Sequence, residues 1–378
     1  MVTESPFGIS LAKDSSRPLA DLLEPDVTLI CCLVNSSGYL ALGDLVVSHP
    51  RGSDPTPMHL PLSADKVAHQ AKDDEIFSLL QKLIVRNRTV LQWSGSVAVS
   101  RAICRLIMEK SGDGHDLLDL HETLQMSGLA DAELSQVGLI YSYFNPQGSA
   151  KIQTHNCTDR STDSTYLFES GNGAWPFFDV DTGTAPLSGE HFIKSFITQA
   201  IYNLCSEKFV QLNYDFLYGG WFEFCKTNVV LPEKIPYAIV FWQKSPCGVE
   251  GMHDLNFAGL TYSSYIDQYL VIVSLDAVEG QQRRRTFAVG NFLSSGVLAR
   301  EIPQYEPAVV FHVVNNEPFG SIYADTTPDN IKFEFEGSGV RSFKVEKELM
   351  ERLSASLDSG DVMRRACLDW SGGGTDNN

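Results

Sequence analysis

The sequence has few basic residues and no long apolar run. It contains 29 Lys and Arg against 47 Asp and Glu in 378 residues, a formal net charge of −18. Nucleic acid requires a basic surface, so this balance argues against nucleic acid as a partner. No apolar run reaches the roughly 18 residues of a membrane helix, and the N-terminus lacks the pattern of a secretory signal. We therefore expect a cytoplasmic protein that does not bind membranes.

Signatures of metal sites, disulfides and cofactors are also missing. None of the eight cysteines forms a CxxC pair, and several lie in apolar segments, so they are typical of reduced, buried thiols. The nine histidines show no HExxH or other ligand spacing. No GxGxxG follows a strand, and no GxxxxGK[ST] is present. We expect no metal and no cofactor, and we interpret the basic run Arg283–Arg285 as a solvated loop between two strands.

The chain does contain enough apolar material for a sizeable core. Hydrophobic residues make up 43% of it, and 378 residues suggest roughly two domains. After a polar, proline-interrupted start, the run from Thr28 to Val34 predicts a strand. Turn residues follow at Asn35–Gly38, and Tyr39–Ser48 predicts a second strand. The sequence therefore predicts a β-hairpin that begins at Thr28.

Helices follow in blocks between strands. Apolar residues at three- and four-residue spacing predict a helix that Gly95 opens and that ends before Gly112. Further helices are expected from Asp116 to about Met126 and from Ser188 onward. Helix blocks between antiparallel strand blocks imply layered α+β packing. Strands are predicted at Thr89–Ser94, Gly138–Thr154 (a hairpin), Thr165–Ser170, Trp221–Thr227 and Tyr237–Trp242.

Beyond about residue 245 the chain becomes richer in β-strand patterns and ends in one more helix, Val345–Leu357. We therefore divide it into four parts: residues 1–25, a tail or propeptide; 26–243, the first domain; 244–360, a β-rich C-terminal region ending in a helix; and 361–378, a flexible tail.

The first domain resembles proteasome β-subunits and the bacterial proteasome-like peptidases, which are N-terminal-nucleophile (Ntn) hydrolases. In that family a catalytic threonine starts the first strand, and an aspartate ends the second strand sixteen residues later. Thr28 and Asp44 have that separation, and Gly38 falls at the family's turn glycine. Asp65–His69 resembles the family segment that contains the charged lysine, here Lys66.

Two later segments extend the resemblance over roughly residues 26–242. Gly171-Asn172-Gly173 stands where the family has Gly-Ser-Gly, and Asp215–Gly220 resembles an Asp-x-x-Ser-Gly-Gly signature. The resemblance implies a four-layer αββα sandwich, with the β-rich C-terminal region added to it.

The resemblance also implies a chemistry. A threonine with a free α-amine uses that amine as the base for its own hydroxyl, which becomes the nucleophile. Thr28 would be nucleophile and base, and Lys66 the ammonium that stabilises developing negative charge. Asp44 would orient Lys66. The remaining positions implied are Asp215 around the site, an amide of Asn172 or Gly173 in an oxyanion hole, and Tyr218 nearby.

Three departures separate the chain from an active family member. Val27, and not glycine, precedes Thr28, and Asn172 and Tyr218 replace two family serines. Two hypotheses therefore stand: a threonine-type peptidase or amidohydrolase, and a catalytically inactive proteasome-like subunit with a structural or binding role. A third places the action in the C-terminal region, as a module that binds a protein partner. The family resemblance implies self-association as a ring or dimer.

Overall fold

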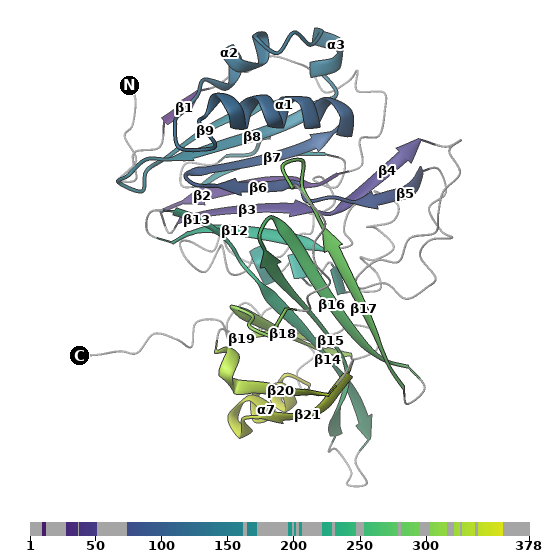
Figure 1. Cartoon of the computed structure of the whole chain (residues 1–378). Helices are drawn as coiled ribbons and strands as arrows, with labels where there is room; N and C mark the ends of the chain where they lie inside the picture. Colours follow the sequence, from purple (N-terminus) through teal and green to yellow (C-terminus); the bar gives the residue numbers. More distant parts are fainter. Residues whose placement is uncertain are drawn as a thin grey trace, which may run out of the picture. The chain divides into compact units, whose positions relative to one another are not determined.

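The computed structural model describes part of this chain. The described residues are 10–12, 28–36, 38–50, 74–161, 165–171, 196–198, 200–201, 204–205, 221–228, 231–246, 253–278, 281–294, 303–315, 321–325, 327–336 and 339–357. Within them the protein is mostly β-sheet with few helices (Figure 1).

The chain divides into two compact units, and each is built from separate stretches of sequence. Unit 1 comprises residues 1–181, 211–234 and 290–295. Unit 2 comprises residues 182–210, 235–289 and 296–378. The boundary that we predicted after residue 243 falls inside a strand of unit 2, β14 (Tyr237–Pro246). The predicted first domain therefore differs from unit 1 at its C-terminal end.

The first sheet of unit 1 has five strands in the order β1-β9-β8-β7-β6. Its strands are β1 (Ser10–Ala12), β6 (Leu83–Arg86), β7 (Thr89–Gly95), β8 (Val137–Phe144) and β9 (Ala150–His155). All neighbours are antiparallel except β1, which pairs in parallel with β9 at the edge. The hairpin predicted over residues 138–154 is confirmed as β8 and β9.

Three helices cover one face of this sheet (Figure 1). They are α1 (Val97–Lys110), α2 (Leu120–Gln125) and α3 (Asp131–Leu134). Helix α1 buries Val99, Ile103 and Ile107 against Trp93 and Tyr141 of the sheet. Its apolar spacing therefore predicted the helix, whose buried face also includes Cys104 and Met108.

The second sheet of unit 1 has six strands in the order β10-β11-β2-β3-β12-β13. Their bounds are β2 (Ile30–Asn35), β3 (Gly38–Asp44), β10 (Thr158–Asp159), β11 (Thr165–Ser170), β12 (Phe222–Asn228) and β13 (Leu231–Lys234). Every pairing within it is antiparallel. The predicted hairpin from Thr28 is confirmed, with the pairing running from Ile30 opposite Gly43 to Asn35 opposite Gly38.

Gly38 closes this hairpin with φ at 145°, in a region of backbone conformation that other residues rarely adopt. The second predicted strand is split after Asp44. Its continuation, β4 (Val46–Pro50), leaves the sheet and pairs with β5 (Asp74–Leu79). The polypeptide therefore bends away directly after the aspartate.

The two sheets of unit 1 pack face to face through a shared apolar core. Ile30, Cys32 and Ala41 of the second sheet share a cluster of buried side chains with Val90 and Ile140 of the first sheet. The described part of unit 1 therefore has three layers, one of helices and two of sheet. The fourth, helical layer that the resemblance implies is not confirmed among the described residues of this unit. Residues of the helix predicted from Ser188 onward that are described belong to unit 2.

Unit 2 is built around a six-stranded sheet in the order β17-β16-β15-β14-β18-β19. Its remaining strands are β15 (His253–Ile266), β16 (Tyr269–Val278), β17 (Gln281–Val289), β18 (Val309–Asn315) and β19 (Ser321–Asp325). Strands β14 and β18 are parallel, and the other neighbours are antiparallel. Arg283–Arg285 lie within β17, so the interpretation of this run as a loop was wrong.

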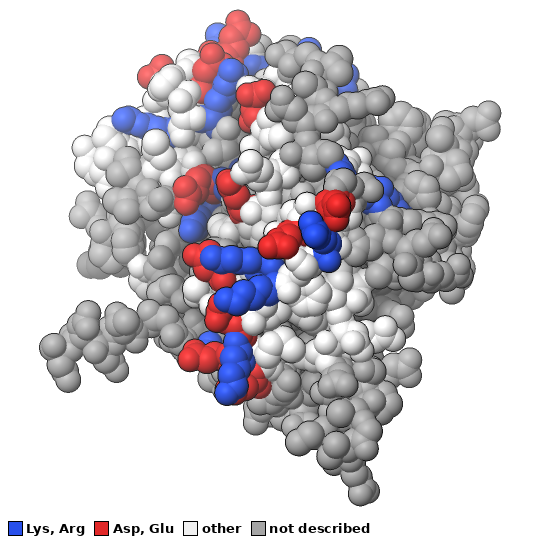
Figure 2. All heavy atoms as spheres, turned by 60° about the horizontal axis from the view of Figure 1, so that its bottom comes forward, with Lys and Arg blue, Asp and Glu red and all other residues white. Residues whose placement is uncertain are grey.

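A hairpin and a helix pack on this sheet. They are β20 (Ile331–Glu336), which follows the short 3-10 helix η3 (Pro328–Asn330), with β21 (Gly339–Val345), and α7 (Lys347–Leu357). Leu349 and Leu353 of α7 join Ile331 and Val340 of the hairpin in one cluster with the sheet. On α7, the exposed side chains of Lys347 and Glu351 form an ion pair of 3.3 Å. Figure 2 shows acidic and basic side chains interspersed among the described residues of the face it presents. Neither sign of charge forms a separate patch there.

Candidate functional site

Asp44 lies at the centre of a buried polar site in unit 1, where β3 ends. Its side chain is fully buried, and its Oδ1 accepts a hydrogen bond of 2.9 Å from the backbone N–H of Leu29. In return, the N–H of Asp44 donates to the carbonyl oxygen of Leu29 at 3.0 Å. These two bonds fix the backbone of the residue that follows Thr28. Asp44 therefore fixes the position of the backbone next to Thr28.

Lys82, immediately before β6, supplies the positive charge of this site. Its Nζ lies 2.6 Å from Asp44 Oδ1, and both side chains have no exposed surface. It also donates to the carbonyl oxygen of Val46, just beyond the bend after β3. A lysine ammonium has three N–H donors, so these two bonds leave one donor. The ion pair joins the start of β6 to the end of β3.

Burial and charge act in opposite directions on Lys82. Burial lowers its pKa from the ordinary value, because an ammonium loses its hydration inside the protein. The carboxylate of Asp44 acts to raise the pKa by charge and by hydrogen bonding, and Glu223 adds a further contribution. A buried ammonium needs such partners, since an unpaired charge in a protein interior is very costly.

Thr28 lies at the edge of this site with its side chain almost fully buried. It is 3% exposed, and its Oγ1 has no hydrogen-bond partner among the described residues. Gly171, which follows β11, packs directly on it. A Cβ atom at Gly171 would lie 1.9 Å from the carbonyl oxygen of Thr28 and 2.7 Å from Oγ1. Only glycine allows this approach, and its φ of 98° also favours glycine.

A small group of hydroxyls lies beside Gly171. Ser170, the last residue of β11, has its Oγ 2.8 Å from Oγ of Ser94 and donates to the carbonyl oxygen of Asn156 at 3.2 Å. Gly138 makes room for them, because a Cβ there would lie 1.9 Å from Ser170 Oγ. Ser94 precedes Gly95 and the start of α1. The group thus links the Thr28 side of the second sheet to the first sheet.

A second buried ion pair lies next to Lys82. Glu223 of β12 is fully buried, and its Oε1 lies 2.6 Å from Nζ of Lys234, the last residue of β13. The same ammonium donates to Oε1 of Gln81 at 2.5 Å. Burial raises the pKa of Glu223, and the charge of Lys234 opposes that rise. Two carboxylates and two ammoniums therefore lie together in this part of unit 1.

The structure describes only some of the residues predicted for the site. Thr28 and Asp44 lie near each other, joined through Leu29. Lys66, Asn172, Gly173, Asp215 and Tyr218 lie outside the described residues, so their predicted roles stay predictions. The carboxylate to which Lys66 was assigned is bound to Lys82.

The sequence patterns did not point to Lys82, Ser170 or Glu223, although the sequence contains a signal for the first. Lys82 sits between Leu79-Leu80 and Leu83-Ile84-Val85, and a lysine inside an apolar stretch is rarely buried without a charged partner. Ser170 directly precedes the glycine motif at Gly171. Nothing local distinguishes Glu223 from the exposed glutamates of other strands.

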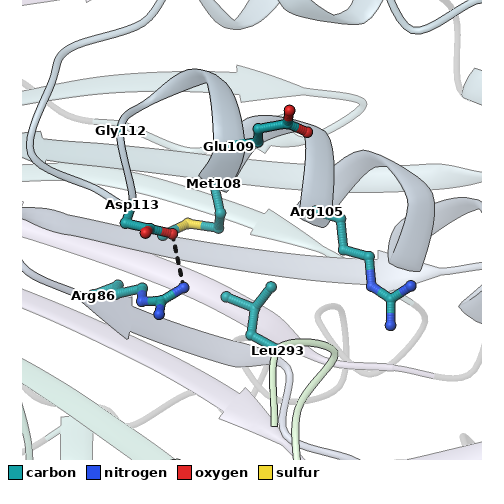
Figure 3. A pocket seen from close by; sticks show the side chains of 7 residues that line it. All are labelled: Arg86, Arg105, Met108, Glu109, Gly112, Asp113 and Leu293. Atoms are coloured by element: carbon teal, nitrogen blue, oxygen red, sulfur yellow. Dashed lines mark hydrogen bonds and ion pairs between the residues drawn. The ribbon is translucent and has the colours of Figure 1, made fainter. Parts of the chain in front are cut away.

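A shallow hollow of about 270 Å³ lies elsewhere in unit 1, at the C-terminal end of α1 (Figure 3). In it Arg86 Nη1 lies 2.8 Å from Asp113 Oδ1, with Leu293 beside the pair. Its lining residues are Arg86, Arg105, Met108, Glu109, Gly112, Asp113 and Leu293. None of these belongs to the buried site around Asp44.

Comparison with known proteins does not place the chain in a family. No protein-family model matches it, and no curated protein matches its sequence. Among solved structures, the crystal structure of eukaryotic HslV from Trypanosoma brucei is similar at a TM-score of 0.30 and 13% identity. The match covers 52% of this chain and 97% of the HslV chain. Similarity at this level establishes neither the fold nor the function.

Within the described part of the chain, the helices are all too short or too polar to cross a membrane.

Proposed function

We propose that this chain is the precursor of a proteasome-like threonine-type peptidase or amidohydrolase, with Thr28 as the nucleophile. The observation that carries the proposal is the buried Asp44–Lys82 pair, whose aspartate also holds the backbone next to Thr28. Buried, paired charges beside an unpartnered hydroxyl are typical of sites that move protons. The resemblance in the hairpin supplies the reaction class.

In this proposal, cleavage of the Val27–Thr28 bond frees the α-amine of Thr28. The amine takes the proton of the Thr28 hydroxyl, and the oxygen attacks the substrate carbonyl. The remaining N–H of Lys82 stabilises negative charge as it develops on that oxygen. Asp44 keeps Lys82 protonated and fixes the position of its ammonium group. Lys82 thereby takes the role that the sequence resemblance gave to Lys66.

Collapse of the adduct breaks the C–N bond of the substrate, and the Thr28 ammonium returns its proton to the leaving amine. Water then hydrolyses the acyl–enzyme that results, with the same amine as base. Ser170, directly before Gly171, forms a hydroxyl pair with Ser94. In the proposal they occupy the place that the two replaced family serines would have filled. Asn172 and Gly173, directly after Gly171, keep their predicted role in the oxyanion hole, and Asp215 and Tyr218 keep theirs around the site.

The inactive-subunit hypothesis rests on a different observation. Thr28 is 3% exposed, and in the intact chain its nitrogen is part of a peptide bond to Val27. A threonine that remains in this state has no basic amine and no access for a substrate. In that case the Asp44–Lys82 pair only closes the end of the hairpin, and the protein acts by binding.

The intact mass of the purified protein, with N-terminal sequencing, separates the two. The enzyme proposal expects loss of residues 1–27 and a new N-terminus at Thr28. It also expects hydrolysis of fluorogenic peptides that falls at least about 10³-fold in Thr28→Ala. Thr89→Ala is the matched control, because Thr89 is likewise buried in unit 1 and its hydroxyl bonds Gly114 and Tyr141, which are not part of the site around Asp44.

A full-length mass without hydrolysis supports the inactive subunit, and hydrolysis that survives Thr28→Ala contradicts the enzyme proposal. Self-association as a ring or dimer is part of the same proposal. Light scattering on the sample used for the mass measurement tests it: a monomer at micromolar concentration contradicts self-association. Partner binding through the C-terminal region stays a prediction. A truncation at 243 would not test it cleanly, since it removes residues 290–295 of unit 1.

A further inference from the structure

Lys82 is flanked by two buried carboxylates, and only one of them bonds its ammonium group. Asp44 of β3 is the bonded one, at 2.6 Å. Glu223 lies on the neighbouring strand β12, opposite Gly43 and one position from Phe222, which faces Asp44. Its charge favours the ammonium form of Lys82. The residue thus acts on Lys82 from the strand next to the one that carries Asp44.

Glu223 also faces the backbone at the start of β6. The N–H groups of Lys82 and Leu83 lower the pKa of Glu223, against the effect of burial. Gly43, opposite Glu223, lies against the Lys82 stem, since a Cβ at Gly43 would lie 3.5 Å from that of Lys82, at ordinary contact distance. Glu223 is therefore placed to hold both the charge and the backbone of Lys82.

Lys234 and Gln81 fix Glu223 in turn. Lys234 Nζ bridges Glu223 Oε1 and Gln81 Oε1, and Gln81 directly precedes Lys82 in the chain. The Gln81 backbone N–H donates to the carbonyl oxygen of Gly290, which anchors this segment from the other side. The two ion pairs are balanced, with two negative and two positive charges, so the cluster is buried without net charge.

We propose that Glu223, held by Lys234, is a positioning residue for Lys82: it keeps the ammonium charged and directed toward Thr28. The catalytic meaning of this role rests on the proposed function above. Without the negative charge of Glu223, Lys82 would keep only the carboxylate of Asp44 to favour its ammonium form. Lys82 would then lose its proton at a lower pH.

The test replaces Glu223 with its near-isosteric amide, Glu223→Gln. In the active protein, the alkaline limb of kcat/KM is expected to move to lower pH by roughly one unit. KM at pH 6 should stay unchanged, because Glu223 does not touch substrate. A loss of activity that is equal at every pH would indicate a structural role and overturn the proposal.

A second readout does not depend on activity. The Cε resonance of Lys82, followed by ¹³C NMR in lysine-labelled protein and assigned with Lys82→Met, reports its protonation directly. Its titration should move to lower pH in Glu223→Gln. If that shift occurs while the wild-type protein hydrolyses nothing, the link between Glu223 and Lys82 holds and the proposed function fails. If Lys82 titrates unchanged in the folded variant, the link is overturned.

Glu233→Gln is the matched control. Glu233 lies on β13 next to Lys234, but its side chain is exposed and its ion pair with Lys226 is long, at 3.7 Å. It should leave the Lys82 titration and the pH profile at their wild-type positions, and an equal shift there would overturn the proposal. If Glu223→Gln does not fold, Glu223→Gln/Lys234→Gln removes both charges and should give a smaller shift in the same direction.

Discussion

The Nζ atom of Lys82 lies 2.6 Å from Oδ1 of Asp44, and neither side chain has exposed surface. The pair joins two strands of different sheets and leaves the protein interior with two neutralised charges. Either charge alone would be strongly unfavourable there. Removing either residue alone should therefore lower the free energy of unfolding.

Lys82→Met should therefore destabilise the protein by about 3–5 kcal/mol, because it leaves the Asp44 carboxylate buried without its partner. Urea unfolding followed by tryptophan fluorescence measures the loss. Lys226→Met is the control, since Lys226 is half exposed and 3.7 Å from Glu233; it should change stability by less than about 0.5 kcal/mol. Equal losses in the two variants would show that Lys82 is not buried as described.

Gly171→Ala tests the close approach of this glycine to Thr28. Both the φ of 98° and the 1.9 Å contact with the Thr28 carbonyl oppose a side chain. Gly128→Ala separates the two causes, because Gly128 has a φ of 74° but open space around its Cβ position. We expect the free energy of unfolding to fall by about 1 kcal/mol in Gly128→Ala. In Gly171→Ala it should fall by at least about 2 kcal/mol more than that. Thermal unfolding of both variants measures the difference, and equal losses would contradict the contact.

His312 of β18 predicts a pH dependence in unit 2. Burial lowers its pKa to about 3, and its Nδ1 accepts a hydrogen bond of 3.1 Å from Trp242 Nε1. An unfolded histidine has a pKa of about 6.5, so below that pH the unfolded state binds more protons than the folded state. Stability is then complete above pH 6.5 and falls as the pH decreases toward 3.

The contribution of His312 amounts to about 2 kcal/mol lost between pH 7 and pH 5. His312→Gln should remove this part of the pH dependence in denaturant unfolding. His121→Gln should keep it, because His121 is exposed on α2. An unchanged slope in His312→Gln would mean that His312 is protonated in the folded protein.

The buried thiols should resist chemical modification. Burial raises the pKa of Cys32 to about 12, and Cys31 beside it is also fully buried. Only thiolates react rapidly with iodoacetamide, so raising the pH to 9 should accelerate labelling of Cys32 very little. Peptide mass spectrometry of labelled native protein measures this at each cysteine, with guanidinium-unfolded protein as the reference. Rapid native labelling of Cys32 would contradict its position in the core.

The parts of the fold that were predictable are encoded locally. The hairpin could be located from the apolar run that begins at Thr28 and the turn residues at Asn35–Gly38. The helix α1 could be located from the three- and four-residue spacing of its apolar residues. Strand β15 was missed, because its apolar alternation changes phase at a bulge, from Leu255 and Phe257 to Leu260 and Tyr262. Its pairing with β14 and β16 provides the order that its own residues do not indicate.

The site was predictable only in part, for a geometric reason. Asp44 could be found by its spacing from Thr28, since both lie on one hairpin. Its partner could not, because three lysines, Lys66, Lys72 and Lys82, follow before β6, and the path of the intervening chain decides which reaches the carboxylate. Glu223 reaches the site across a strand pairing of nearly 180 positions, which no local pattern reveals.

The discontinuity of unit 1 has a consequence for how the protein is made. The ring of Phe292 lies 4.5 Å from that of Trp93, and the guanidinium carbon of Arg101 lies over the Phe292 ring, 5.6 Å from its centroid. On a ribosome that adds about 5–20 residues per second, Trp93 is synthesised roughly 10–40 s before Phe292. During that interval the first sheet lacks part of its cover. The nascent chain therefore exposes an apolar surface that a chaperone would bind until residues 290–295 arrive.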